Sequence, residues 1–204
     1  MGFYQSRIVP HLVHLAMRQA TLVPYRRRVI AGATGRVLEI GFGSGLNLQF
    51  YGSGVSEVVG LEPSAKLLSM ARRSVASTSR NAELLEASAE AIPLDDHSVD
   101  TVVTTWTLCT IPDVTRALKE TRRVLKTDGR LLFVEHGRSP DAGVRRWQDR
   151  LNPLWRPIAG GCHLNRPIAD VITQSGFRID DLTTGYGQGP KPMAFMYEGV
   201  ARPQ

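Results

Sequence analysis

The chain has 204 residues and a formal net charge of +6, and 42% of its residues are apolar and 22% charged. This length and composition are those of a soluble globular protein with one α/β domain, large enough to bury a full core. No run reaches 18 apolar residues, the N-terminus lacks a signal-peptide pattern, and the two cysteines have no zinc-type spacing, so we expect a cytoplasmic protein without membrane span, disulfide or metal.

The N-terminal segment, residues 1–36, carries the whole excess of positive charge. It holds six arginines and no acidic residue, while acids and bases balance over the rest of the chain. Apolar residues at helical spacing predict one or two helices over residues 8–30, with a boundary at Pro24. We expect residues 1–36 to form a basic amphipathic helical lid over a ligand pocket. Peripheral contact with an anionic membrane is the alternative, and the arginine run at 26–28, which is short and has no interleaved aromatic residues, disfavours nucleic acid.

A glycine-rich turn follows the first predicted strand. Residues 36–46 read Arg-Val-Leu-Glu-Ile-Gly-Phe-Gly-Ser-Gly-Leu, which predicts an apolar strand that runs into the turn and then into a helix. Gly41, Gly43 and Gly45 permit a positive φ and the close approach of a ligand, and Glu39 stands two residues before them. This is not the Gly-x-Gly-x-x-Gly spacing of a dinucleotide site. A carboxylate here would repel a pyrophosphate and suits a cationic amino-acid or sulfonium ligand, although a plain tight turn would contain the same glycines.

A second acid ends the second predicted strand. Glu62 follows the apolar residues of the strand at 57–61, and Pro63 ends that strand. An acid at this edge of a parallel sheet can accept hydrogen bonds from both hydroxyls of a ribose. The alternative is that Glu62 only favours the start of a helix, since Ser64 is a suitable N-cap for a helix over residues 65–74.

The remaining chain alternates strands and helices. We expect a third strand and a loop within 82–94, a fourth strand at 101–105, a helix at 112–126, a fifth strand at 130–135, a mostly helical stretch at 146–176 broken near Pro153, Pro157 and Gly160-Gly161, and a final hairpin of strands at 177–182 and 193–200. The pattern predicts an α/β fold, with a Rossmann-like, seven-stranded, mostly parallel sheet, helices on both faces and a C-terminal antiparallel hairpin.

The glycine-rich motif resembles the first motif of the class I S-adenosylmethionine (SAM) methyltransferases. In that family the turn packs against SAM, so the resemblance implies SAM as cofactor and S-adenosylhomocysteine as product. Residues 82–94 are similar to the family's adenine loop, with Ala87-Ser88 in place of its usual Gly-Asp. The implied cofactor-binding residues are Glu39, Gly41, Gly43, Gly45, Asn47, Glu62, Pro63, Ser88, Ala89, Glu90 and Thr105.

Later segments resemble a narrower group, the animal microsomal thiol S-methyltransferases and their short bacterial relatives. The resemblance rests on Leu-Cys-Thr-Ile-Pro at 108–112, Val-Glu-His at 134–136, Trp-Gln at 147–148 and Gly-Cys-His-Leu-Asn-Arg at 161–166. It spans residues 36 to 200 and implies a SAM-dependent methyltransferase domain at residues 37–204. The animal enzymes have an apolar membrane-anchoring N-terminus where this chain has its basic segment.

The acceptor is expected at the carboxyl ends of the strands, where Trp106, Cys109 and Trp147 are candidate substrate-binding residues. Either tryptophan could instead be a core residue. Cys109 and Cys162 could equally be small buried hydrophobic residues, which is the more usual role of a free cysteine.

A basic group would assist a thiol acceptor. The thiolate is the reactive form, and a free thiol, with a pKa near ~8.5, is mostly protonated at neutral pH. His136, at the end of the fifth strand, is the first candidate base, followed by His163 and Asp149. The alternative for His136 is a hydrogen bond to the loop backbone.

The sequence therefore predicts a SAM-dependent methyltransferase that acts on a small molecule, by resemblance a small thiol or sulfide. Thr104-Thr105-Trp106 after the fourth strand lacks the Asn-Pro-Pro-Tyr pattern of enzymes that methylate planar nitrogens, which disfavours base methylation. A phospholipid amine or quinone methyltransferase is the enzymatic alternative, because a basic N-terminus suits a lipid headgroup. A SAM-binding module without turnover, acting through its basic face, is the alternative of another class.

Overall fold

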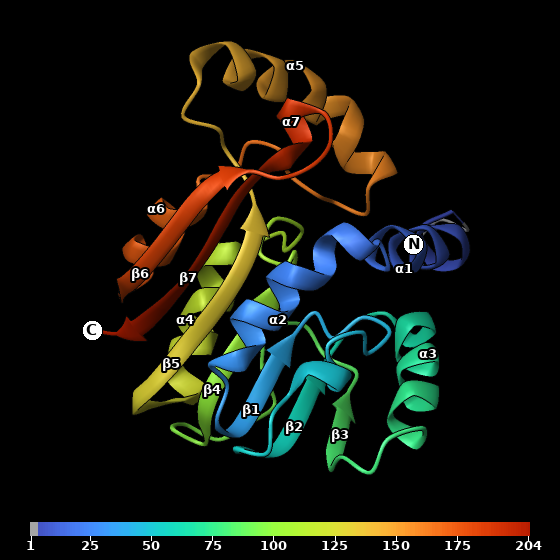
Figure 1. Ribbon diagram of the computed structural model, residues 1–204, viewed down its shortest axis with the longest axis vertical. Coiled ribbons are helices and arrows are strands. Elements are labelled where there is room, and N and C mark those ends of the chain that lie inside the picture. Colours follow the sequence, from blue (N-terminus) through green and yellow to red (C-terminus); the bar gives the residue numbers. More distant parts are fainter. Residues whose placement is uncertain (1–3) are drawn as a thin grey trace.

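The computed structural model describes residues 4–204 and is built around one seven-stranded sheet (Figure 1). The strands run in the order β3-β2-β1-β4-β5-β7-β6. They are β1 (Gly35–Ile40), β2 (Val55–Leu61), β3 (Ala82–Leu85), β4 (Val99–Thr105), β5 (Leu125–His136), β6 (Phe177–Tyr186) and β7 (Phe195–Pro203). The first five pair in parallel, whereas β7 pairs antiparallel with both β5 and β6. The predicted Rossmann-like sheet with a C-terminal hairpin is confirmed.

Helices cover both faces of the sheet. They are α1 (Val9–Met17), α2 (Val23–Ala31), α3 (Ala65–Ala76), α4 (Val114–Val124), α5 (Ala142–Ile158), α6 (Ile168–Gln174) and α7 (Lys191–Ala194). Successive strand residues point to opposite faces, so Leu38 packs in the cluster that holds α4 and α6, and Val37 in the cluster that holds α2 and α3. Helix α5 lies beyond the carboxyl end of β5 (Figure 1). No helix within residues 4–204 is long and apolar enough to span a membrane.

The connection between β1 and β2 differs from the prediction. A helix was expected directly after the glycine turn, but the structure has only the short 3₁₀ turn Leu48–Phe50 there. A connection between parallel strands needs a dozen residues or more. Residues 41–54 barely meet this length, so few residues remain after the glycine turn to form a helix. Tyr51 then anchors the returning chain, because its hydroxyl donates to Glu39 Oε2 across 2.6 Å.

The prolines of α5 do not break the helix where a break was expected. Pro153 and Pro157 both lie inside α5, which runs unbroken to Ile158. Because the fixed φ of proline is compatible with a helix, each of these prolines removes one backbone N–H donor but does not interrupt the helix. The chain turns at Gly160 and Gly161, whose φ angles of +61° and +91° suit glycine.

Candidate active site

A cavity of about 470 Å³ opens at the carboxyl ends of β1, β2 and β4. Their last residues, Ile40, Leu61 and Thr105, form part of its wall. The glycine turn, one face of α1, residues 62–64, 87–89, 105–107 and 110–112, and the turn 159–161 also line it. Cavities of this size and position commonly hold small ligands in open α/β sheets.

The glycine turn shapes the cavity floor. Gly41, Gly43 and Gly45 have φ angles of +72°, +59° and +81°, a region that side chains disfavour. At Gly41 a Cβ would also lie 2.2 Å from Thr107 Oγ1, so no larger residue fits there. Gly41 and Gly43 line the cavity, whereas Gly45 lies behind it against Phe42 and Ser74.

Glu62 joins the second strand to the glycine turn. Its carboxylate accepts the N–H of Gly43 at 3.0 Å and the N–H of Ser64 at 2.9 Å. Burial raises the pKa of Glu62, and these two bonds counteract the rise. Ser64 caps α3 as expected, with its Oγ accepting from the Leu67 N–H at 3.4 Å. Glu62 and Pro63 line the cavity.

Glu39 is only 1% exposed and lies beneath the turn. Its two carboxylate oxygens accept from Asn47 Nδ2 at 2.8 Å and from Tyr51 at 2.6 Å. Burial raises the pKa of Glu39 to about 7, although both bonds and the charge of Arg26 act in the opposite direction. Asn47 does not line the cavity itself, so its visible role is to connect Glu39 to its neighbours.

Arg26 is a cavity residue that the sequence reasoning missed. Its guanidinium, on α2, donates to Asn47 Oδ1 at 2.6 Å, to Thr105 Oγ1 at 3.4 Å and to the Met17 carbonyl at 3.1 Å. It also lies 4.9 Å from the ring centre of Trp106, and the residue is 5% exposed. The signal was present in the spacing, because Arg26 shares a helix face with the buried Val29 and Ile30.

The predicted adenine loop contributes small residues. Ala87, Ser88 and Ala89 line the cavity. Glu90 does not, since its carboxylate accepts from the Asp113 N–H at 2.7 Å, at the start of α4. Ser88, which stands where the family motif has Asp, forms a local turn in which its Oγ accepts from the N–H of Glu90 at 3.2 Å.

The segment after β4 forms the wall expected to face the acceptor. Trp106 lines the cavity with a left-handed φ of +52°, a strained conformation for a large side chain. The buried Glu135 carboxylate holds the following loop by accepting from the N–H groups of Thr107 at 2.9 Å and Leu108 at 3.0 Å. Burial raises the pKa of Glu135 to about 7 against these bonds.

The three predicted bases do not line the cavity. His136 Nε2 lies 2.8 Å from Cys162 Sγ. Burial lowers the pKa of His136, but the hydrogen bond and charge of Cys162 and the charge of Glu135 together raise it above its ordinary value. Burial, with Arg166 and Arg156 nearby, lowers the pKa of His163 to about 4. The exposed Asp149 accepts from Asn165 at 2.7 Å.

Two predicted substrate residues also lie outside the cavity lining. Trp147 is 57% exposed on α5, while its neighbour Gln148 is buried and bonds the Gly137 carbonyl at 2.9 Å. Cys109 lies behind the wall, beside Cys162. The hydrogen bond between the two sulfur atoms raises the pKa of Cys109 and lowers that of Cys162.

Among the described histidines, His14 is the one that lines the cavity. Val9, Pro10, Val13, His14 and Met17 form the face of α1 turned toward it. His14 Nδ1 lies 2.7 Å from Ser44 Oγ in the glycine turn. Burial, then Arg18 and His11, lowers the pKa of His14, so the ring is neutral at pH 7. The sequence analysis treated this segment as a basic lid or a membrane-contact surface and assigned no role in the cavity to His14.

Comparisons with known proteins agree with this architecture. Residues 38–133 match the methyltransferase domain family. The rat thiol S-methyltransferase TMT1B is 36% identical over 145 residues, which cover 69% of this chain and 59% of that protein. Phosphatidylethanolamine N-methyltransferase of Cereibacter sphaeroides is 34% identical over 116 residues, covering 54% of this chain and 57% of that protein. The crystal structure of YcgJ from Bacillus subtilis superposes with a TM-score of 0.66 at 18% identity, covering 89% of this chain and 95% of YcgJ.

The chain therefore carries a domain of the methyltransferase family with the fold of the SAM-dependent methyltransferases. Within that family it is similar to the thiol S-methyltransferases, and it spans about three fifths of the length of the rat enzyme.

The raised pKa of Glu39 predicts a pH-dependent stability. The folded protein holds this proton up to about pH 7 and the unfolded chain only up to about pH 4.5. The unfolded chain thus binds fewer protons between these values, and the contribution of Glu39 to the free energy of unfolding falls as pH rises through this window. Urea unfolding without SAM should show Glu39→Gln gaining on the wild type by up to ~1.4 kcal/mol per pH unit there.

The matched control is Glu83→Gln, since Glu83 is exposed on β3. That variant should follow the wild type at every pH. Parallel stability curves for Glu39→Gln and the wild type would contradict the assignment.

Proposed function

We propose that this chain is a SAM-dependent methyltransferase whose acceptor is a small thiol or sulfide. The observation that carries the SAM part is the placement of charge across the cavity. Arg26 lies by the end of β4 and Glu62 at the end of β2, on opposite sides of β1. SAM has a carboxylate at its amino-acid end and two ribose hydroxyls, so the two groups match it as a donor and an acceptor.

The cavity residues then take distinct roles in the proposal. Arg26 binds the carboxylate of SAM, and Glu62 accepts from the ribose hydroxyls. The small residues at 87–89, with Leu67 and Ile111, give the adenine an apolar slot. Glu39, which is 1% exposed, acts through Asn47 and Tyr51, whose side chains donate to its two oxygens. Glu62 accepts one backbone N–H at each oxygen, but it is 7% exposed and each oxygen keeps a second lone pair for a ribose hydroxyl.

The thiol acceptor rests on the similarity to thiol S-methyltransferases, and the apolar covering of the cavity agrees with it. Val9, Val13 and Trp106 suit an uncharged acceptor. In the reaction the thiolate sulfur forms a bond to the SAM methyl carbon while the bond from that carbon to the sulfonium breaks. The products are a methyl thioether and S-adenosylhomocysteine, and positioning supplies most of the acceleration.

The proton of the acceptor thiol needs a base, and the proposal gives this role to His14. Its ring lines the cavity and is neutral at pH 7. The charged groups that face the same cavity are Glu39, Glu62 and Arg26. His11 on α1 and Arg18, just after α1, are close enough to affect the pKa of His14. The first sequence candidate, His136, is engaged with Cys162 behind the wall.

A lipid amine is the second candidate acceptor. Large apolar side chains are exposed on two neighbouring segments, the N-terminal one and α5: Ile8, Leu12, Leu15, Leu154 and Ile158. The two segments are in contact, because the Tyr4 hydroxyl donates to the carbonyl of Ile158. With Arg7 and Arg18 close by in sequence, this surface suits an anionic lipid layer. The similarity to a phosphatidylethanolamine N-methyltransferase agrees with this reading.

The acceptor is tested by release of S-adenosylhomocysteine from purified protein and SAM. One set of reactions holds small alkyl thiols and the other holds phosphatidylethanolamine vesicles, and Gly43→Val serves as the variant with a blocked turn. The proposal expects release with thiols and none from Gly43→Val. Release with vesicles alone would replace the thiol by a lipid amine, and SAM binding without release in either set would contradict turnover.

His14→Asn tests the base in the same assay. The rate with a thiol should fall on the order of 10²-fold at pH 7, because the neutral imidazole no longer takes the proton. The deficit should shrink above the thiol pKa of ~8.5, where the acceptor ionises unaided. His97→Asn, at an exposed histidine outside the cavity lining, is the control and should keep the wild-type profile. A constant ratio of wild type to His14→Asn across pH would remove His14 from proton transfer.

A further inference from the structure

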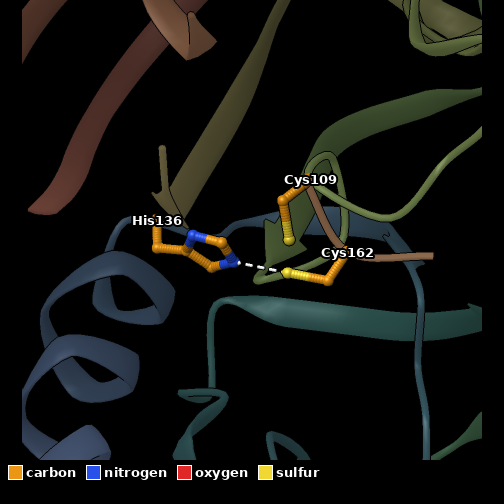
Figure 2. A group of neighbouring side chains, drawn as sticks. All are labelled: Cys109, His136 and Cys162. Atoms are coloured by element: carbon orange, nitrogen blue, oxygen red, sulfur yellow. Dashed lines mark hydrogen bonds between the residues drawn. The ribbon is translucent and has the colours of Figure 1, made fainter. Parts of the chain in front are cut away.

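Three side chains with metal-binding atoms meet behind the cavity wall. The Sγ atoms of Cys109 and Cys162 and a ring nitrogen of His136 all lie within 4.8 Å of one another. Figure 2 shows them converging from the loop after β4, the end of β5 and the turn after α5. Both cysteines are buried, at 1% and 8% exposure.

Their chemistry is that of a soft or borderline cation site. Two cysteine sulfurs and one histidine nitrogen form a donor set that zinc accepts, with bonds of about 2.3 Å to sulfur and about 2.0 Å to nitrogen. Tetrahedral bonds of these lengths hold the donors roughly 3.5–4 Å apart. The cluster already lies near that size, and His136 and Cys162, now 2.8 Å apart, need only separate by a small side-chain movement.

The backbone around the cluster is fixed independently of any ligand. The N–H of Cys109 donates to Glu135 at 3.4 Å, and its carbonyl accepts from the N–H of His163 at 2.9 Å. Arg166 holds the same loop through the carbonyls of Leu108 and Ile111. Rigid support of this kind is what a binding site needs to keep its donors in place.

The imidazole gives a second, separate observation. His136 Nδ1 is buried and has no hydrogen-bond partner among residues 4–204. The hydrogen bond found for this ring is therefore the one between Nε2 and Cys162. Nε2 is the ring nitrogen that faces the sulfur atoms (Figure 2), so it would be the cation ligand, while the buried Nδ1 would carry the ring proton.

We propose that Cys109, His136 and Cys162 bind one thiophilic divalent cation of the zinc type, with the fourth position left to water or a small ligand. The site is independent of the proposed methyl transfer. Its position has a structural consequence, because Thr110 and Gly161, each next to one of the cysteines, line the cavity. A bound cation would tie these two wall segments to the end of β5.

Direct metal binding tests the site without any enzyme assay. The full chain, freed of metal and kept reduced with a phosphine, is titrated with Co²⁺ while thiolate-to-cobalt charge-transfer absorption is recorded. Zn²⁺ is then added to displace the cobalt. We expect one equivalent of Co²⁺, a charge-transfer band from two thiolates, and full displacement by zinc.

Variants distinguish this site from chance binding. Cys109→Ser, Cys162→Ser and His136→Ala should each weaken zinc binding at least about 100-fold. His11→Ala, which removes an exposed histidine, should bind as the wild type does. The stabilisation of the wild type by zinc in thermal unfolding should be absent in any folded cluster variant, with far-UV circular dichroism reporting the fold. The proposal would be overturned if the wild type bound no metal. It would also be overturned if the wild type and the three cluster variants bound equally, since that would mean an adventitious ion only.

Discussion

A guanidinium group buried at the carboxyl edge of a sheet loses its hydration and must be surrounded by acceptors. Arg26 meets this condition through Asn47, Thr105 and the Met17 carbonyl, with the face of Trp106 beside it. Asn47 in turn donates to Glu39, which also accepts from Tyr51. One hydrogen-bonded chain thus joins α2, the β1–β2 connection, β1 and β4. Removing any member would leave a buried polar group without its partner, so these elements are fixed relative to one another.

This constraint also explains the polarity of the cavity. Both acids line the cavity, but Glu39 of β1 is bonded to the chain that supports Arg26, whereas Glu62, which follows β2, ties the glycine turn to α3. The two carboxylates therefore have different roles, although their positions in the sequence pattern are alike. The N-terminal segment contributes one half of the charge pattern, through Arg26, and covers the cavity with α1.

Local patterns predicted what depends on neighbours in sequence. The apolar strands, the glycine turn and Ser64 as a cap were all readable, and they set the sheet and the floor of the cavity, whereas the short connection after the turn was expected to be a helix. The positions of Arg26, His14 and the Cys109–His136–Cys162 cluster were not, because each depends on segments that meet only in the folded chain. The two cysteines are 53 positions apart, which excludes a local zinc motif but says nothing about their distance in space. The bases predicted at 136, 149 and 163 were chosen because their segments follow strands or helices near the expected site. In the fold, the loop held by Glu135 and Arg166 lies close to His136 and His163, and none of the three predicted bases lines the cavity.

The central claim is that Arg26 is balanced by protein acceptors and still available to a ligand carboxylate. It is tested most directly by isothermal titration of the wild type and Arg26→Met with S-adenosylhomocysteine and with its decarboxylated analogue. The wild type should prefer the carboxylate-bearing ligand by about 1.5–3 kcal/mol, the scale of a hydrogen bond to a charged group. Circular dichroism is used to check that Arg26→Met is folded. This variant should bind the two ligands equally, because the preference arises from the interaction between Arg26 and the ligand carboxylate. An undiminished preference in Arg26→Met, or none in the wild type, would contradict the account.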